Sequence, residues 1–357
     1  MSTSDSRALS SHDAFRNQQI DLFQYFLCNS TAERNQLSNT FDLWDSVPRY
    51  AISRQAMDKA RKSKGFLDLK EIPFQWRGQS LCAVIQPARV RIDKNGTTLD
   101  YYPSANEELI EDALRKIAAE QDCGFFDKPN HQSGVVFTLY MLRDELKKRG
   151  HSRSYQQIMI SLEILARSTI AIKTADGDGP MGFDVSPYFP RLSSVSHSRL
   201  AEDPNAKWVV RFHPLVTASI DALTYRQFNY AQMMTHKSQL ARWLHKQLSL
   251  KFTFASLTTS FDIRFSTIKR DSALLEGYKQ ERQAVAALDS SLNELQASGV
   301  LTHIKKNDVR GQRSKLEDVV YTLTASKEFI RHIKAANKRQ MMNENHPKKL
   351  STTGSYR

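Results

Sequence analysis

Apolar residues recur along the chain at the spacing of helices in some segments and of strands in others. Between residues 109 and 172 this spacing predicts an ordered series of helices and strands. Residues three and four positions apart indicate amphipathic helices, and short apolar runs between turn signals indicate strands. In chain order these segments are a helix carrying Leu109 to Ile117, a strand at Val135–Phe137, helices carrying Leu139 to Leu146 and Ile158 to Leu165, and a strand at Ile170–Ile172.

A β-hairpin is predicted just before this set. The strand-like residues 80–85 and Val90–Ile92 lead to the turn Asp93–Gly96, and its Asn-Gly pair tolerates positive φ. Ser104 and Glu107 then form a capping-box pattern, which predicts that the first helix begins at this point.

The same order of elements returns in the second half of the chain. A helix carries Leu240 to Leu250, a second long helix spans 278–296, and strands follow at 300–304 and 319–323. One supersecondary unit used twice is therefore expected, although any helix, turn and strand would match partly by chance. A constant offset of 130 residues aligns Ile158, Leu162, Leu165, Ser168 and Ile170 with Leu288, Leu292, Leu295, Ser298 and Val300.

Three helices followed by a two-stranded hairpin make up the winged form of helix-turn-helix. We therefore expect an α+β, predominantly helical fold with two tandem winged-helix domains, over 71–223 and 224–337. Residues 1–70 lack sustained periodicity and are expected to form a flexible N-terminal arm. Residues 338–357 are expected to form a disordered basic tail.

The start of each third helix carries side chains suited to DNA. Arg pairs with guanine and Gln with adenine, while Ser, Lys and Tyr suit phosphates, which a helix N-terminus also favours. The alternative is an ordinary solvated helix start. The predicted DNA-binding residues are Arg153, Ser154, Tyr155, Gln156 and Gln157 in the first copy and Lys279, Gln280, Arg282 and Gln283 in the second.

The net charge of +13 is concentrated near the end of the chain, where residues 299–357 hold thirteen Lys or Arg against five Asp or Glu. A basic surface attracts a polyanion and is favoured by counterion release from phosphates, whereas a solvated basic tail is the plain alternative. Five cations fall in or beside the loop between the last two strands, which favours a wing that contacts DNA. They are Lys305, Lys306, Arg310, Arg313 and Lys315.

Several other classes of protein find no support. No apolar run approaches the ~20 residues of a membrane helix, no signal peptide is visible, and three widely spaced cysteines fit a reducing cytoplasm. Gly177–Gly182 satisfies GxGxxG, but Pro180 lies inside it and later prolines block the helix that must follow, so a wing loop is expected. No P-loop occurs, and neither a cofactor nor a metal is predicted.

These residues resemble a known family, the plasmid replication initiators of the TrfA and RepA type, over roughly Leu81 to Leu323. The resemblance implies a cytoplasmic protein with two winged helices that binds directly repeated double-stranded sites, called iterons, at a plasmid origin. It also implies opening of adjacent A·T-rich DNA, recruitment of the host replication initiator and helicase, and control of copy number by self-association to dimers. The segments that carry it are Ile92–Ala118, Phe137–Tyr140 with Tyr155–Leu165, Ser194–His197, and Ser238–Arg242.

One short motif fits the same setting. Gln19, Ile20, Asp21, Leu22 and Phe23 resemble the pentapeptide that binds the bacterial sliding clamp, in which a flexible arm presents apolar anchors to a preformed pocket. The alternative is an amphipathic helix that uses Ile20, Phe23 and Phe26. A second match at 247–252 falls on a predicted helix, where its leucines are expected to be core.

Two rival functions use overlapping features. A rolling-circle replication nuclease needs two histidines separated by one apolar residue beside a nucleophilic tyrosine, and here the closest histidines, His236 and His245, are nine residues apart. The candidate nucleophiles therefore lack a metal site that would activate them; they are Tyr101, Tyr102, Tyr225 and Tyr230. The chain is therefore expected not to be an enzyme. A winged-helix transcriptional repressor would use the same modules as an initiator, so it stays open as the alternative.

Overall fold

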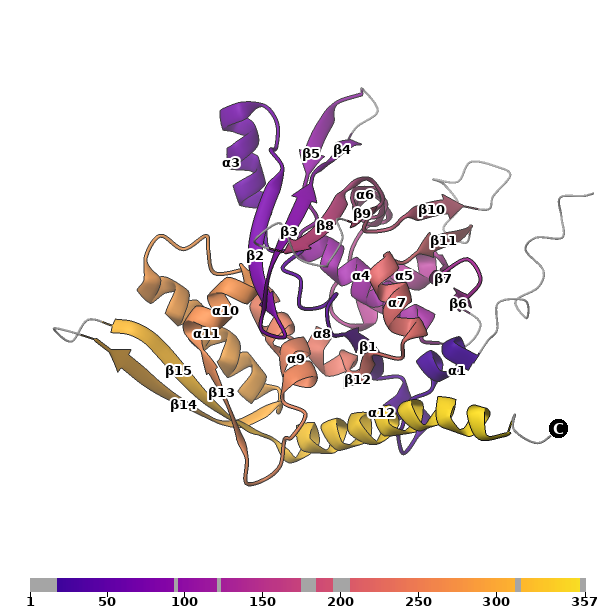
Figure 1. Cartoon of the computed structure of the whole chain (residues 1–357). Helices are drawn as coiled ribbons and strands as arrows, with labels where there is room; N and C mark the ends of the chain where they lie inside the picture. Colours follow the sequence, from indigo (N-terminus) through magenta and orange to yellow (C-terminus); the bar gives the residue numbers. More distant parts are fainter. Residues whose placement is uncertain are drawn as a thin grey trace, which may run out of the picture.

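The computed structural model describes residues 18–92, 96–120, 123–174, 184–194, 206–311 and 316–353 of the chain, with side chains up to 344. These residues form twelve helices and fifteen strands (Figure 1). The expectation of a predominantly helical fold is wrong, because antiparallel sheets run through both halves and make the fold mixed α/β. No helix in the described ranges is both long enough and apolar enough to cross a membrane.

The N-terminal segment is not a flexible arm from residue 18 onward. It contains α1 (Gln18–Gln24), α2 (Thr31–Arg34), β1 (Leu37–Phe41) and α3 (Arg54–Lys64). Phe23, Phe41 and Trp44 are buried in the main core, and β1 pairs with β12 (Tyr225–Asn229). Short amphipathic stretches near 20–28 and 54–64 do have helical spacing, as α1 and α3 show. Local spacing does not show that partners far away in the chain, such as β12, anchor this segment. Residues 1–17 lie outside the described part.

The larger unit is built on two four-stranded antiparallel sheets and a separate hairpin. The hairpin pairs β4 (Ala88–Arg91) with β5 (Thr98–Tyr101), as predicted, while turn residues 93–95 lie outside the described part. One sheet has the order β2 (Lys70–Trp76), β3 (Gln79–Gln86), β8 (Thr169–Thr174), β9 (Asp184–Pro187), and the other β10 (Arg191–Ser194), β11 (Lys207–Arg211), β7 (Gln132–Thr138), β6 (Gly124–Asp127).

Five helices pack around these sheets. The Glu107 carboxylate accepts a hydrogen bond from the backbone N–H of Ser104 at 2.9 Å, so the predicted helix start is confirmed. Ile158, Leu162 and Leu165 are buried on one helix face, as their spacing predicts. The helices are α4 (Ala105–Ala118), α5 (Leu139–Lys148), α6 (Tyr155–Arg167), α7 (Pro214–Asp221) and α8 (Tyr230–Met234).

The smaller unit follows with its own core. Three strands form one sheet in the order β13, β15, β14, and α10 and α11 pack beside it. The final helix continues to Thr353, so the expected disorder after 337 is wrong over this stretch. The elements are α9 (Gln239–Lys251), β13 (Ser260–Arg264), α10 (Phe265–Ser272), α11 (Glu281–Ala297), β14 (Leu301–Arg310), β15 (Leu316–Ala325) and α12 (Lys327–Thr353).

The order helix, strand, helix, helix, strand, strand occurs twice, as α4–β7–α5–α6–β8–β9 and α9–β13–α10–α11–β14–β15, but the first copy has an additional strand, β6, between α4 and β7. In the second copy all three strands share one sheet, whereas in the first β7 belongs to a different sheet from β8 and β9. Apart from Ala273, the residues of the main core end at Met234, and the second core begins at Leu240, so the core changes later than the predicted boundary at 223/224.

Candidate nucleic-acid interface

Helix α11 presents a polar outer face of low net charge. Leu288, Leu292 and Leu295 are buried against the sheet, because their spacing keeps them on one side of the helix. Small and amide side chains of the opposite face suit the base edges of a major groove. The exposed residues of α11 outside its first residue are Arg282, Gln283, Ala286, Ser290, Asn293, Gln296 and Ala297.

All four predicted residues of this copy are exposed at the N-terminal end of α11. The helix begins at Glu281, later than predicted, so Lys279 and Gln280 precede it. Nε of Arg282 donates a hydrogen bond to Oε1 of Gln280 at 2.8 Å, which orients the guanidinium beside the helix start. Their placement therefore agrees with a role in contacting DNA.

The hairpin β14–β15 is attached to α11 through Asp289. One oxygen of Asp289 accepts a hydrogen bond from the Tyr321 hydroxyl at 2.7 Å, and the other lies 2.7 Å from Nζ of Lys306. Burial, and then the bond to Asp289, raise the pKa of Tyr321 well above its usual value. Lys306 therefore helps to hold the hairpin on the helix, which the sequence did not indicate.

A second contact fixes the hairpin to α10. Asp318 accepts hydrogen bonds from the Ser266 backbone N–H at 3.1 Å and the Ser266 hydroxyl at 2.6 Å. Although burial raises its pKa, these bonds lower the pKa of Asp318 overall. The hairpin is thus held by both α10 and α11.

The remaining predicted cations of this hairpin differ in their surroundings. Lys305 is exposed, and within the described ranges it makes no ion pair. Arg310 is exposed and pairs with Asp308 at 2.9 Å. Arg313 and Lys315 lie outside the described residues. Lys305 is thus the best placed of the described cations for a phosphate.

In the first copy, most predicted residues are occupied by local contacts. Nε and Nη2 of Arg153 both donate to Oδ1 of Asn106, at 3.2 and 2.8 Å. Ser154 and Gln157 form the capping box of α6, and the ring of Tyr155 lies 4.7 Å from the guanidinium carbon of Arg143. Of these five residues, Gln156 is exposed and makes no hydrogen bond within the described part of the chain. The predicted wing loop at 177–182 lies outside that part.

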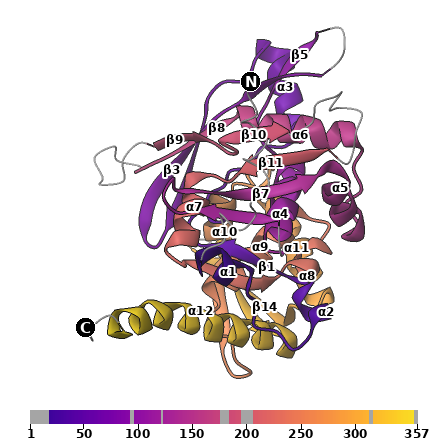
Figure 2. The ribbon, with the colours of Figure 1, turned by 90° about the vertical axis from the view of Figure 1, so that its right-hand side faces the viewer.

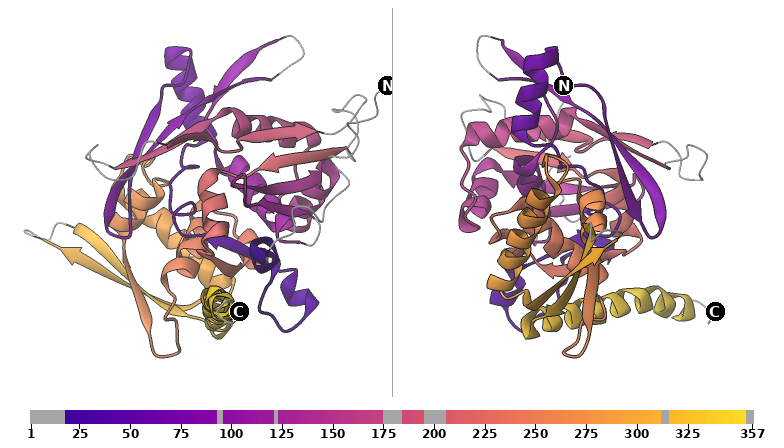
Figure 3. Two further views of the ribbon diagram at one scale, coloured as in Figure 1. Left: turned by 45° about the vertical axis from the view of Figure 1, so that its right-hand side comes forward. Right: turned by 90° about the vertical axis from the view of Figure 1, so that its left-hand side faces the viewer.

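Helices α6 and α11 lie on the same side of the molecule (Figures 2 and 3). In Figure 2 both are toward the right, whereas the β2–β3 hairpin projects to the left. The two candidate DNA-contacting helices are therefore placed so that one duplex could pass both.

The proposed clamp motif is not available in this structure. Residues 19–23 belong to helix α1, in which Phe23 and Ile20 are 1% and 2% exposed and Leu22 is half-buried. Phe26 is also buried, so the amphipathic-helix alternative is the one observed. The second match on α9 is core, as expected, with Leu248 and Leu250 buried.

The residues of the rival nuclease also have structural roles. His236 and His245 meet in space, with Nε2 and Nδ1 3.0 Å apart, but both are buried, and burial lowers the pKa of His236 to about 4. Among the described residues no three His, Cys, Asp or Glu side chains form a group able to hold a metal. Tyr101 lies under Arg54 and Arg61, and the Tyr102 hydroxyl donates to the Asp68 carbonyl.

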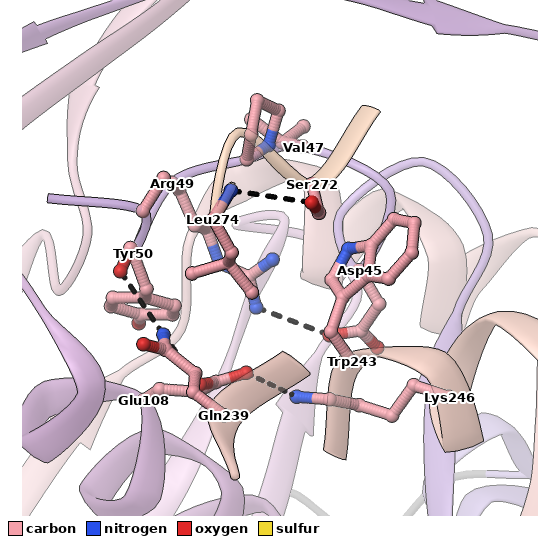
Figure 4. Close-up of a pocket in the computed structure, with 12 residues that line it drawn as sticks. Asp45, Val47, Arg49, Tyr50, Glu108, Gln239, Trp243, Lys246, Ser272 and Leu274 are labelled. Atoms are coloured by element: carbon pink, nitrogen blue, oxygen red, sulfur yellow. Dashed lines mark hydrogen bonds and ion pairs between the residues drawn. The ribbon is translucent and has the colours of Figure 1, made fainter. Parts of the chain in front are cut away.

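A cluster of buried charges between the two units was not predicted at all. Arg115 forms two bonds of 2.9 Å with the Asp45 carboxylate, and Nη2 of Arg49 lies 2.9 Å from Glu111. Burial raises the pKa of Glu111, but Arg49 and then Arg115 outweigh it and hold that pKa at about 2. Lys246 of α9 joins the cluster through Glu108 (Figure 4).

Comparisons with known proteins give limited information. No family model and no curated protein matches the chain. A crystal structure of domains 2 and 3 of RctB is similar to it with a TM-score of 0.47 and 11% identity, covering 73% of this chain and 92% of that one. The structure of the Pi initiator protein in complex with iteron DNA is similar with a TM-score of 0.42 and 10% identity, covering 68% of this chain and 98% of that one. Scores below 0.5 at such identity do not establish a common fold or function.

Proposed function

We propose that this chain is a sequence-specific double-stranded DNA-binding protein with two winged-helix units. In the second unit, α11 enters the major groove and the β14–β15 hairpin contacts the backbone beside it. The observation that carries the proposal is the exposed polar face of α11 next to a cation-bearing hairpin that Asp289 and Asp318 hold in place. In the first unit, α6 takes the corresponding position with Gln156 toward the DNA.

The proposed role of this binding is initiation of plasmid replication at repeated origin sites. The sequence resemblance to plasmid initiators supports it, and so does the placement of α6 and α11 on one side, which suits neighbouring turns of a duplex. Under this role the protein recruits the host initiator and helicase, and its own association into dimers limits copy number. The net charge of +13 favours a polyanionic partner.

A footprint on the DNA that flanks the protein's own gene tests both the sequence-specific binding and the role in replication initiation. An initiator gives regularly spaced protections separated by multiples of about 10 base pairs. One protected site overlapping a promoter, without support for replication of a minimal origin in vivo, would indicate the repressor instead. If the wild-type chain prefers no duplex sequence over random DNA, the proposed function is wrong.

A further inference from the structure

An open groove runs between α6 and the β4–β5 hairpin. It is lined by Arg89, Arg91 and Thr98 from the hairpin and by Gln156, Met159 and Arg167 from α6, among others. We propose that this groove binds the phosphate backbone of DNA that flanks the segment read by α6. The hairpin is then a third DNA-contacting element, in addition to the two winged helices, and this inference rests on the proposed function.

The hairpin is fixed on the body of the protein. Ala88 and Val90 are buried against Ile164 of α6 and form a small core of their own. On the other strand, Tyr101 lies 4.6 Å from the guanidinium carbons of both Arg54 and Arg61, which belong to α3. A cation held on such a support loses little freedom when it binds, so it can contribute to affinity.

The inward placement of Ala88 and Val90 turns the alternate residues Arg89 and Arg91 outward. Arg91 lies opposite Thr98 in the hairpin register, and within the described ranges it has no acidic partner. Arg89 pairs with Asp100 at 2.9 Å but is 64% exposed. The Asp100 carboxylate is only 12% exposed and also accepts a hydrogen bond from the Leu67 N–H at 3.1 Å, so it does not depend on Arg89 alone. The exposed Arg89 guanidinium can therefore turn to a phosphate, which accepts two parallel hydrogen bonds from it.

Arg167 supplies a third cation from the far end of α6. It is 59% exposed and pairs with Glu163, one helical turn earlier, at 2.7 Å. Guanidinium groups bind phosphate oxygens through two parallel hydrogen bonds, which suits a backbone ligand. The groove thus offers cations on both of its walls.

DNA is favoured over an acidic peptide because the groove is continuous with the proposed reading surface. Gln156 lines the groove and is also one of the two exposed residues in the first turn of α6, together with Gln157. A duplex whose major groove accepts the start of α6 would therefore bring its backbone along the hairpin. The cations would contact successive phosphates without reading sequence.

The experiment compares the full chain with its Arg91→Ala variant on the footprinted site. For B-DNA each phosphate contact contributes about 0.9 to the slope of log affinity against log salt. Arg91→Ala should therefore reduce that slope by about one and lower the Kd ratio between 200 and 50 mM salt about threefold. The matched control is Arg77→Ala, which changes an exposed arginine of the β2–β3 turn. That hairpin lies on the opposite side of the molecule from α6 (Figure 2).

Duplex length separates this inference from the proposed function. Removing the base pairs on the α6 side should weaken wild-type binding more than it weakens binding of Arg91→Ala, because one of the groove's contacts is already missing in the variant. Equal losses in both proteins, or an unchanged salt slope, would overturn the groove proposal while DNA binding itself stands. Failure of the wild type to bind the full-length site would refute the proposed function. Unchanged thermal melting of both variants shows that folding is intact.

Discussion

Nζ of Lys246 lies 3.0 Å from Oε1 of Glu108 and 3.0 Å from Oδ2 of Asp112. All three side chains are at most 5% exposed, so one buried cation on α9 holds two carboxylates of α4. Burying charges is costly unless they are paired and hydrogen-bonded, and here pairing occurs only when the two units adopt this arrangement. The units are therefore fixed relative to each other, which holds α6 and α11 on one side.

Lys246→Met should strongly destabilise the protein. The variant leaves Glu108 without its Lys246 partner and Asp112 with Arg115 alone. Breaking a buried pair in this way costs about 3–5 kcal/mol. Urea unfolding monitored by circular dichroism measures the loss. The triple variant Lys246→Met, Glu108→Gln, Asp112→Asn should recover much of it, because no uncompensated charge remains. A loss below about 1 kcal/mol for the single variant would show that the cluster does not join the units.

Stability should fall as the pH drops from about 4.5 to about 2, the unfolded and folded pKa values of Glu111. A carboxyl whose pKa is lower in the folded state stabilises the fold above its unfolded pKa, and that stability is lost as the pH falls toward the folded value. Asp45 acts in the same direction, whereas burial raises the pKa of Asp112 and offsets part of the effect. Urea midpoints measured across this range should decrease with acidification.

Glu111→Gln tests the assignment of that pH dependence. The slope of unfolding free energy against pH reports how many more protons the unfolded state binds than the folded state. Glu111→Gln should reduce this number by up to one between about pH 2 and 4.5, whereas Glu276→Gln, at an exposed position, should leave it unchanged. The same slope in Glu111→Gln as in the wild type would mean that other carboxyls are responsible.

The helices with one apolar face could be predicted from sequence, and the polar clusters could not. On α4 the buried Leu109, Leu114 and Ile117 follow the helical period, but Glu108 and Asp112 look like ordinary solvated residues. Their burial depends on α9, more than a hundred residues later. Charge patterns within one helix contain no information about a partner at that separation.

For the candidate DNA surface, the sequence likewise indicated which residue types are present but not which neighbouring side chains they bind. Lys305, Lys306 and Arg310 lie on β14 of the last hairpin. However, Lys306 is held by Asp289, and Arg153 is bonded to Asn106. A sequence shows that a basic residue follows a strand, but not whether a carboxylate from a neighbouring element lies within reach. The role of the β4–β5 hairpin was missed because its residues form a plain strand pattern.

Lys305 should contribute more than Lys306 to nonspecific DNA binding. Lys305 is exposed and makes no ion pair in the described part of the chain, whereas Lys306 must leave Asp289 before it can bind a phosphate. Lys305→Ala should lower the salt slope of binding by about one on any duplex, and Lys306→Ala by less. Titrations at several salt concentrations measure both. A larger slope change for Lys306→Ala would reverse the assignment.

Arg282→Ala should reduce the preference for the cognate site. An arginine that pairs with a guanine contributes about 1–3 kcal/mol of discrimination, while binding to random DNA changes little. Competition titrations with cognate and random duplexes measure the two affinities. Glu281→Ala, at the neighbouring exposed position, controls for a general effect on the start of α11. Equal losses on both duplexes would show that Arg282 contacts only the backbone.

Arg339→Leu should release α1 from the body of the protein. The buried Arg339 of α12 donates to the carbonyls of Leu22 and Phe23 at 2.7 and 3.3 Å and to the side chain of Asn39 at 2.6 Å. Buried acceptors left without donors cost about 1–3 kcal/mol each, so this terminal helix should open first. Limited chymotrypsin digestion should then cut at Leu22 and Phe23 faster than in the wild type. Lys338→Leu, at the exposed neighbouring position, should digest like the wild type, and the same cleavage rate in both variants would show that Arg339 does not hold α1.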